Sequence, residues 1–176
     1  MKLTLTYQGP LPAKQRGISP VKAGMRKAFH PQIQAQASRL IDKTNRIILT
    51  TNVDGYSFIS PAHRAFRTAV ELDILLLSPP NIRLGDSDNR LKTVIDGLTC
   101  PANSEQLQGF AEPETGGPTF CLMEDDSLVQ RVGLDSRQWH GTERGNNDSL
   151  VIVTATVVLS HEADLSSPMS NIFFVL

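Results

Sequence analysis

Alternating hydrophobic and polar positions predict β-strands at several places along the chain. Residues 2–7 and the first half of residues 69–78 alternate, while residues 150–159 are almost entirely apolar and rich in β-branched side chains. Alternation is typical of a strand with one buried face, and a continuous apolar run is typical of a strand buried on both faces. We predict strands over all three segments. Within the second of them, Glu71 and Asp73 fall on the face that we expect to be exposed.

Three shorter strands are predicted between and after these segments. Residues 47–52 and 56–59 flank Asp54-Gly55, a typical hairpin turn. Residues 129–134 carry Val129, Val132 and Leu134 and are expected to continue as another strand.

The helical pattern is clearest after residue 85. Four apolar residues there recur at positions i, i+3, i+4 and i+7 and predict one buried helical stripe: Leu91, Val94, Ile95 and Leu98. A second helix is predicted from Pro31 to about Asn45. Residues 13–29 contain Gly17, Pro20 and Gly24 and are therefore expected to form an ordered loop.

Together these elements predict an α/β fold, with a small mixed sheet of about four to six strands and two main helices. The chain has 176 residues and 40% hydrophobic composition, which is enough for one well-packed domain. Residues 101–119 are rich in proline and glycine and are expected to form a mobile loop. The tail at residues 161–176 ends in apolar side chains, which are expected either to dock into the core or to serve an oligomer interface.

No run of about 18 apolar residues is present, so no membrane span is expected. The first residues lack the layout of a signal peptide. Cys100 and Cys121 have no metal-binding spacing and form no disulfide framework. These features predict a cytoplasmic protein.

Charge is distributed unevenly around a net charge of −1. Residues 1–46 hold nine Lys and Arg against one acid, whereas the remainder holds eight basic and seventeen acidic residues. This asymmetry favours a basic arm that binds a polyanion, or a basic segment that packs against the acidic part of its own chain. The side chains expected to contact phosphates are Lys14, Arg16, Lys22, Arg26 and Lys27. His63 is expected to be a surface residue, since no second histidine has a matching spacing.

Carboxylates gather at two places. Asp86 and Asp88 stand at the start of the predicted helix, where one acid is explained as a helix cap and two also suit a hard cation. Glu124, Asp125 and Asp126 form a second acidic run, which is either a solvated turn or part of the same cation site. Carboxylates brought together repel one another, and a cation or protonation would offset that repulsion.

Read together, the two acidic segments resemble the RusA family of Holliday junction resolvases. The family pattern is D-x-D-N-x-x-K-x-x-x-D-x-L, a variable loop, and then D-D-x-x-V. The matching residues are Asp86, Asp88, Asn89, Lys92, Asp96, Leu98, Asp125, Asp126 and Val129. The match is dense over roughly 45 residues and in the right order. The link at residues 101–119 is longer than is usual in the family, which leaves open whether Glu124 or Asp125 joins Asp126 at the metal.

The resemblance implies a phage or bacterial Mg²⁺-dependent endodeoxyribonuclease, with Mn²⁺ as a possible substitute, that cuts four-way DNA as a homodimer. It implies a metal site made by Asp86, Asp88 and Asp126 with Asp125 as a fourth acid. Lys92 is expected to contact the phosphate in the transition state. Asn89 is expected to orient Asp88 or cap the helix, and Asp96 to hold Lys92.

Three alternatives remain at this point. The first is a relative that binds branched DNA with little or altered cleavage. The second is a nucleotide-sugar transferase, since D-x-D also holds Mn²⁺ under a diphosphate, although no doubly wound pattern is present. The third is a non-enzymatic Ca²⁺ module, which the sequence disfavours because Leu91 and Gly97 occupy the positions of the glycine and glutamate of the familiar calcium loop.

Overall fold

The computed structural model describes residues 1–12, 20–38, 41, 49–80, 87–107, 117–139 and 148–160. Within these ranges the protein is a mixed α/β fold with two sheets and two α-helices. The strands are β1 Lys2–Pro10, β2 Thr50–Val53, β3 Tyr56–Ile59, β4 Thr68–Ser78, β5 Thr119–Phe120, β6 Val129–Gln138 and β7 Asp148–Leu159. The helices are α1 Pro20–Ala37 and α3 Ser87–Leu98, and the 3₁₀ turns are η1 Arg64–Phe66, η2 Ser104–Leu107 and η3 Asp126–Leu128.

The larger sheet has the strand order β1-β7-β4-β6. Strand β7 is antiparallel to both β1 and β4, whereas β6 runs parallel to β4. The register pairs Val70 with Val129 at one end and Ser78 with Gln138 at the other. Strands β1 and β6 are therefore the two edges of this sheet.

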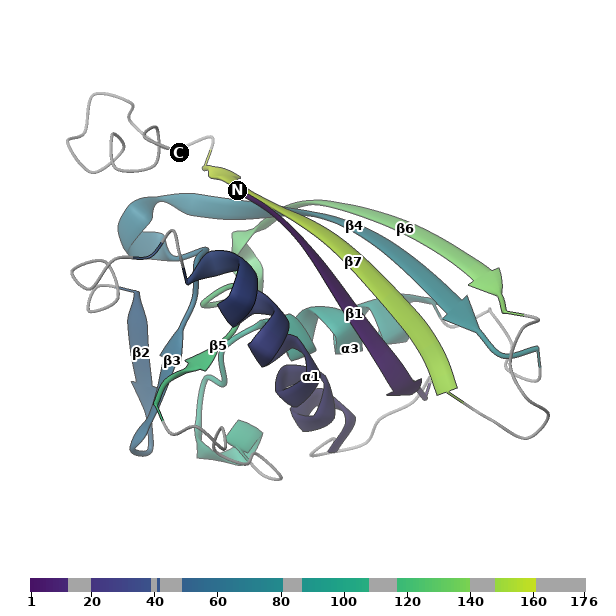
Figure 1. Cartoon of the computed structure of the whole chain (residues 1–176), viewed down its shortest axis with the longest axis horizontal. Coiled ribbons are helices and arrows are strands. Elements are labelled where there is room, and N and C mark those ends of the chain that lie inside the picture. Colours follow the sequence, from purple (N-terminus) through teal and green to yellow (C-terminus); the bar gives the residue numbers. More distant parts are fainter. Residues whose placement is uncertain are drawn as a thin grey trace.

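Both helices lie on one face of the larger sheet, and the small sheet β2-β3-β5 lies beside them (Figure 1). The core forms where the helices meet this face, and it includes Met25, Phe29, Ile33, Val94 and Leu98. The opposite face is uncovered in the described part of the chain. Neither of the two described helices combines the length and apolar character needed to cross a membrane.

The predicted strands are confirmed, with shifts at their ends. The predicted strand at residues 69–78 is β4, in which the side chains alternate between buried and more exposed, and Asp73 is exposed while Glu71 is half-buried. The predicted hairpin is the pair β2 and β3, joined by Asp54 and Gly55 at φ of 46° and 84°. Such positive φ values match the tight turn that Asp-Gly favours. Residues 47 and 48 lie outside the described residues.

The predicted start of the helix near the N-terminus is wrong, although residues 31–37 are helical as predicted. Helix α1 begins at Pro20, continues through Pro31 and ends at Ala37, so much of the predicted loop is helical. Pro20 suits the first helical position, where its missing N–H costs no hydrogen bond. Pro31 removes one interior bond. Burial of Met25, Phe29 and Ile33 on one side of the helix stabilises it across this defect.

The crossing of α1 and α3 depends on a glycine and an arginine. A Cβ added to Gly97 would lie 2.8 Å from the Met25 Cβ, so the close approach of the helices requires glycine there. Beside it, the Arg26 guanidinium is buried and donates to the carbonyl oxygens of Asp96 (3.0 Å), Thr99 (3.0 Å) and Gln106 (3.3 Å). Because the last carbonyls of a helix have no partner within it, Arg26 closes the end of α3.

Two glutamines of α1 cover the β1 edge of the sheet. The Gln32 side chain accepts from the Thr6 N–H at 2.8 Å and donates to the Thr6 carbonyl oxygen at 2.8 Å. Gln36 makes the same pair of bonds with Thr4, at 3.0 and 2.9 Å. The outward backbone groups of Thr4 and Thr6 in β1 are thus satisfied by side chains of their own chain.

Candidate functional site

The first turns of α3 present the predicted acid and lysine to solvent. Asp88, Asn89 and Lys92 are all exposed, and Asp88 lies in the first turn of the helix. Asp88 and Lys92 are four residues apart, so their side chains leave the same side of α3. Asp86 lies outside the described residues. The apolar stripe predicted for this helix is confirmed, since Val94 and Leu98 are buried and Leu91 and Ile95 pack against the core.

Asp96 does not hold Lys92 as predicted. Its carboxylate instead forms an ion pair with Lys22 of α1, at 2.5 Å. The pair joins the two helices where they cross, which explains an acid at this position without any role at a metal.

The described residues of the predicted DNA-contacting arm lie in different surroundings. Arg26 is 3% exposed and its guanidinium is engaged with backbone carbonyls, so it does not contact phosphates. Lys22 is engaged with Asp96, and Lys27 is exposed. Lys14 and Arg16 lie outside the described residues. Basic residues of α1 thus serve in part to bind the chain's own carboxylate and carbonyl groups.

The second acidic segment is held by Arg64. The Arg64 side-chain Nη2 lies 3.0 Å from Asp125 Oδ1 and donates to Ser127 Oγ at 3.2 Å. The backbone N–H of Arg64 donates to Glu124 Oε2 at 3.1 Å. Asp125 also caps η3, because its Oδ1 accepts from the Ser127 N–H at 2.9 Å. Hydrogen bonds from Ser127, reinforced by Arg64, hold the pKa of Asp125 below its usual value.

His63 is buried, contrary to the prediction of a surface residue. Its Nδ1 accepts from the Ala65 N–H at 3.1 Å and caps η1, while its Nε2 lies 3.7 Å from Glu124 Oε2. Burial lowers the pKa of His63, and the Glu124 carboxylate opposes that shift. Glu124 is therefore turned toward His63 and Arg64, and Asp126 is the exposed acid of the three.

The two acidic segments lie toward opposite ends of α3. Near its start, Arg90 Nη1 donates to Ser78 Oγ at the end of β4. Beyond its last turn, the Leu98 carbonyl accepts from the N–H of Leu122, two residues before Glu124. Asp88 and Leu98 are separated by about 15 Å along the helix axis at 1.5 Å per residue.

The predicted metal site is therefore not assembled by the described residues of one chain. Among those residues no three His, Cys, Asp or Glu side chains gather closely enough to hold a metal ion. Carboxylates are suitable ligands for Mg²⁺, and Asp88 and Asp126 are both exposed, but one chain does not bring them to one ion. The predicted cation site of Asp86, Asp88, Asp125 and Asp126 stays a prediction, because Asp86 lies outside the described residues.

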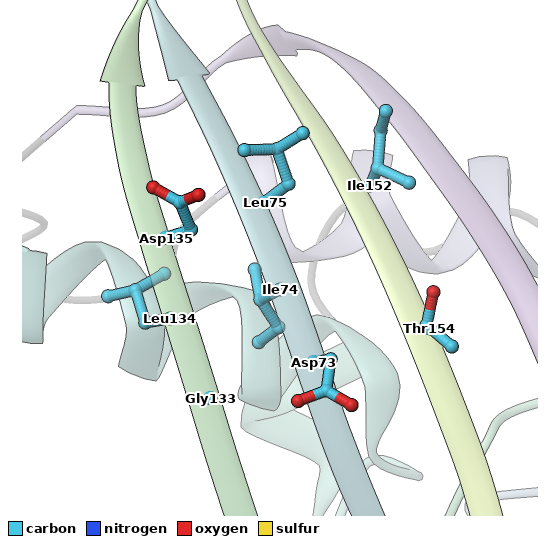
Figure 2. A pocket seen from close by; sticks show the side chains of 8 residues that line it. All are labelled: Asp73, Ile74, Leu75, Gly133, Leu134, Asp135, Ile152 and Thr154. Carbon is cyan, nitrogen blue, oxygen red and sulfur yellow. The ribbon is translucent and has the colours of Figure 1, made fainter.

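A shallow hollow on the uncovered face of the sheet offers no alternative cation site. Figure 2 shows Asp73 and Asp135 on neighbouring strands, with Gly133 leaving the space between them. Arg131 engages Asp73 through two hydrogen bonds of 2.9 and 2.8 Å, and Arg137 engages Asp135. Both carboxylates are thus neutralised by arginines of the same sheet.

Comparison with known proteins adds no relative. No family model, no curated protein and no solved structure matches this chain.

Proposed function

We propose that this protein is a Mg²⁺-dependent endodeoxyribonuclease that cuts four-way DNA junctions, similar in function to the RusA resolvases. The observation that carries the proposal is the exposed group Asp88, Asn89 and Lys92 on the first turns of α3. These are motif residues, and Leu91, the apolar residue between them, packs against the core. The side chains of Asp88 and Lys92 thus match the motif and are exposed to solvent.

The separation of the acids along α3 makes the dimer part of the proposed site. If Asp88 and Asp126 act on one ion, they must come from different subunits, because α3 keeps them apart within one chain. A two-fold symmetric dimer then contains two equivalent sites, each using Asp88 of one subunit and Asp126 of the other. Two sites related by a two-fold axis suit a junction in which two opposed strands are cut.

Each residue has a defined part in the proposed reaction. Bound Mg²⁺ would activate water and stabilise charge on the phosphoryl oxygens. Asp88 and Asp126 would hold the ion, together with Asp86. Lys92, one turn from Asp88, would donate to a phosphate oxygen as negative charge develops. Asp125 would act indirectly, because its Oδ1 is engaged with Ser127 and Arg64 and so orients the turn that carries Asp126.

The second candidate is a junction-binding relative with weak cleavage. The observation that favours it is the same separation of Asp88 from Asp126, since a chain that does not assemble the proposed dimer would bind DNA without a complete site.

The experiment is cleavage of a synthetic four-way junction with Mg²⁺ or EDTA, alongside a linear duplex. Wild-type protein is expected to make paired nicks that need Mg²⁺, and Asp88→Asn is expected to bind the junction without cutting it. Asp96→Asn is the matched control on the same helix and should cut, because Asp96 pairs with Lys22. Full cleavage by Asp88→Asn would overturn the assignment, and binding without nicks by the wild type would favour the second candidate.

A further inference from the structure

The β6 edge of the larger sheet carries an exposed hydrophobic side chain. Val132 is 38% exposed, the most of any large hydrophobic side chain in the described residues. It pairs with Leu72 of β4, which is fully buried. The apolar face of the sheet therefore continues beyond β4 to an edge strand, where Val132 remains in contact with solvent.

The sequence of β6 is complementary to itself when two copies run antiparallel. With Gly133 opposite Gly133 of the partner subunit, Val132 stands opposite Leu134 of the partner subunit. Arg131 likewise stands opposite Asp135 of the partner subunit. Each pair occurs twice by symmetry. Directly opposed residues share a face of the sheet, so the apolar pairs would extend the core and the charged pairs would lie on the uncovered face.

Neighbouring registers lack this match. Moving the centre of symmetry by one residue to Leu134 places Arg131 opposite Arg137 of the partner subunit, and like charges directly opposed are destabilising. The register centred on Gly133 alone pairs an apolar residue with an apolar one and a cation with an anion. Gly133 lies beside Asp73 of β4, and a Cβ added to it would lie 2.7 Å from Asp73 Oδ1, so a larger residue there would have to displace that carboxylate (Figure 2).

We propose that β6 pairs antiparallel with β6 of a second copy of this chain, centred on Gly133, and joins the two sheets into one of eight strands. The direction of β6 determines which parts of the two subunits come together. Strand β6 begins three residues after Asp126, beside the start of β4, and ends beside Ser78, near the start of α3. Antiparallel pairing brings the start of β6 to the end of the partner's β6.

Asp126 would thereby reach the end of the partner subunit where α3 begins. The β6 of one subunit would lie two strand spacings, about 10 Å, from β4 of the other. This is the arrangement that a site shared by two subunits needs. That consequence rests on the proposed function, whereas the pairing of β6 does not.

The register is tested by crosslinking co-expressed Val132→Cys and Leu134→Cys chains with diamide. Two thiols lose their protons and two electrons to diamide as the disulfide forms. The mixture is expected to give crosslinked dimers, because Val132 stands opposite Leu134 of the partner subunit. Neither variant alone is expected to crosslink, because position 132 does not stand opposite position 132 of the partner subunit, nor position 134 opposite position 134. Cys100 and Cys121 are 3% and 2% exposed, so the native thiols are shielded from the reagent. Crosslinking of either variant alone, or none in the mixture, would overturn the register.

The interface is tested by sedimentation of Val132→Glu, with Thr4→Glu on the other edge strand as the matched control. Wild type and Thr4→Glu are expected to be dimers, while Val132→Glu should weaken the dimer at least about tenfold and leave the circular dichroism unchanged. A monomeric wild type, or a Val132→Glu variant that stays as dimeric as the wild type, would overturn the proposal. Because sedimentation does not depend on cleavage, an inactive wild type would count against the proposed function alone.

Discussion

The two edge strands of the larger sheet differ in whether side chains of the same chain cover them. At β1, Gln32 and Gln36 of α1 donate to and accept from the backbone of Thr6 and Thr4, so the edge is closed by its own chain. At β6, the described residues provide no such cover, and Val132 is exposed.

Edge strands present backbone donors and acceptors that can pair with another chain, and proteins usually block them. A sheet with one blocked edge and one unblocked edge can add a single partner and then stop. The difference between β1 and β6 therefore favours a closed dimer over an open-ended filament. In this account, the sheet edge and the acidic motif serve the same assembly.

The largest expected effect comes from breaking the open edge. Val132→Glu should lower junction cleavage at least about tenfold at low protein concentration, because a charge at the interface separates the halves of each site. Cleavage should recover partly as the protein concentration rises. Rates measured across a concentration series, with Thr4→Glu as the control, check this. A concentration-independent loss would mean that Val132 acts within one chain.

The next effect concerns the anchoring of α1, which carries the glutamines. Arg26→Met should destabilise the protein by about 3 kcal/mol, because the carbonyl oxygens of Asp96, Thr99 and Gln106 lose their hydrogen bonds from the guanidinium, and the bond to Thr99 is buried. Urea unfolding measures the change, and Lys27→Met, an exposed substitution on the same helix, should stay within about 0.5 kcal/mol of wild type. Equal effects of the two substitutions would contradict the role assigned to Arg26.

Opening the closed edge should have a smaller effect on stability. Gln32→Ala with Gln36→Ala removes four hydrogen bonds to the β1 backbone and should cost about 1–3 kcal/mol, since exposed bonds each contribute little. The double variant should also associate beyond the dimer, because both edges are then open. Urea unfolding and light scattering measure the two outcomes, with Gln34→Ala on the same helix as control. A double variant that remained strictly dimeric would show that the glutamines do not block β1.

The smallest expected effect is a difference between β6 and β1 in amide protection at low pH. Hydrogen bonds from Arg131 lower the pKa of Asp73, and those from Arg137 lower the pKa of Asp135. A lowered pKa contributes stability above the ordinary value of about 4, and this is lost as the pH falls through the lower folded value. Amide protection along β6 should therefore fall as the pH is lowered below about 4, while protection at Thr4 and Thr6, bonded to neutral amides, should change less. Equal losses at both edges would contradict this.

Local patterns predicted the strands well and the helices unevenly. The alternation in β4 and the Asp54-Gly55 turn depend on neighbouring residues alone, so the sequence was sufficient for them. The part of α1 before Pro31 was missed because Pro20 and Gly24 are helix breakers when considered locally. Burial of Phe29 and Ile33 against the sheet outweighs them, and such burial is visible only in three dimensions.

Some features of the candidate site could be predicted from the sequence, and others could not. Exposure of Asp88 and Lys92 followed from the helical period, which placed Val94 and Leu98 in the core. The role of Arg26 could not be predicted, because a basic residue in a basic segment gives no sign that backbone carbonyls will surround it. The distance from Asp88 to Asp126 depends on the parallel pairing of β6 with β4, which no local pattern determines.

The most direct test of a site shared between subunits is complementation between two inactive variants. Asp88→Asn and Asp126→Asn should each fail to cut the junction alone. Mixed dimers should contain one intact site, with Asp88 from one chain and Asp126 from the other, and one site without either acid. Half of randomly assorted dimers are mixed, so the mixture should recover about a quarter of the wild-type sites and cut single strands. No recovery in mixed dimers shown to form would contradict the shared site.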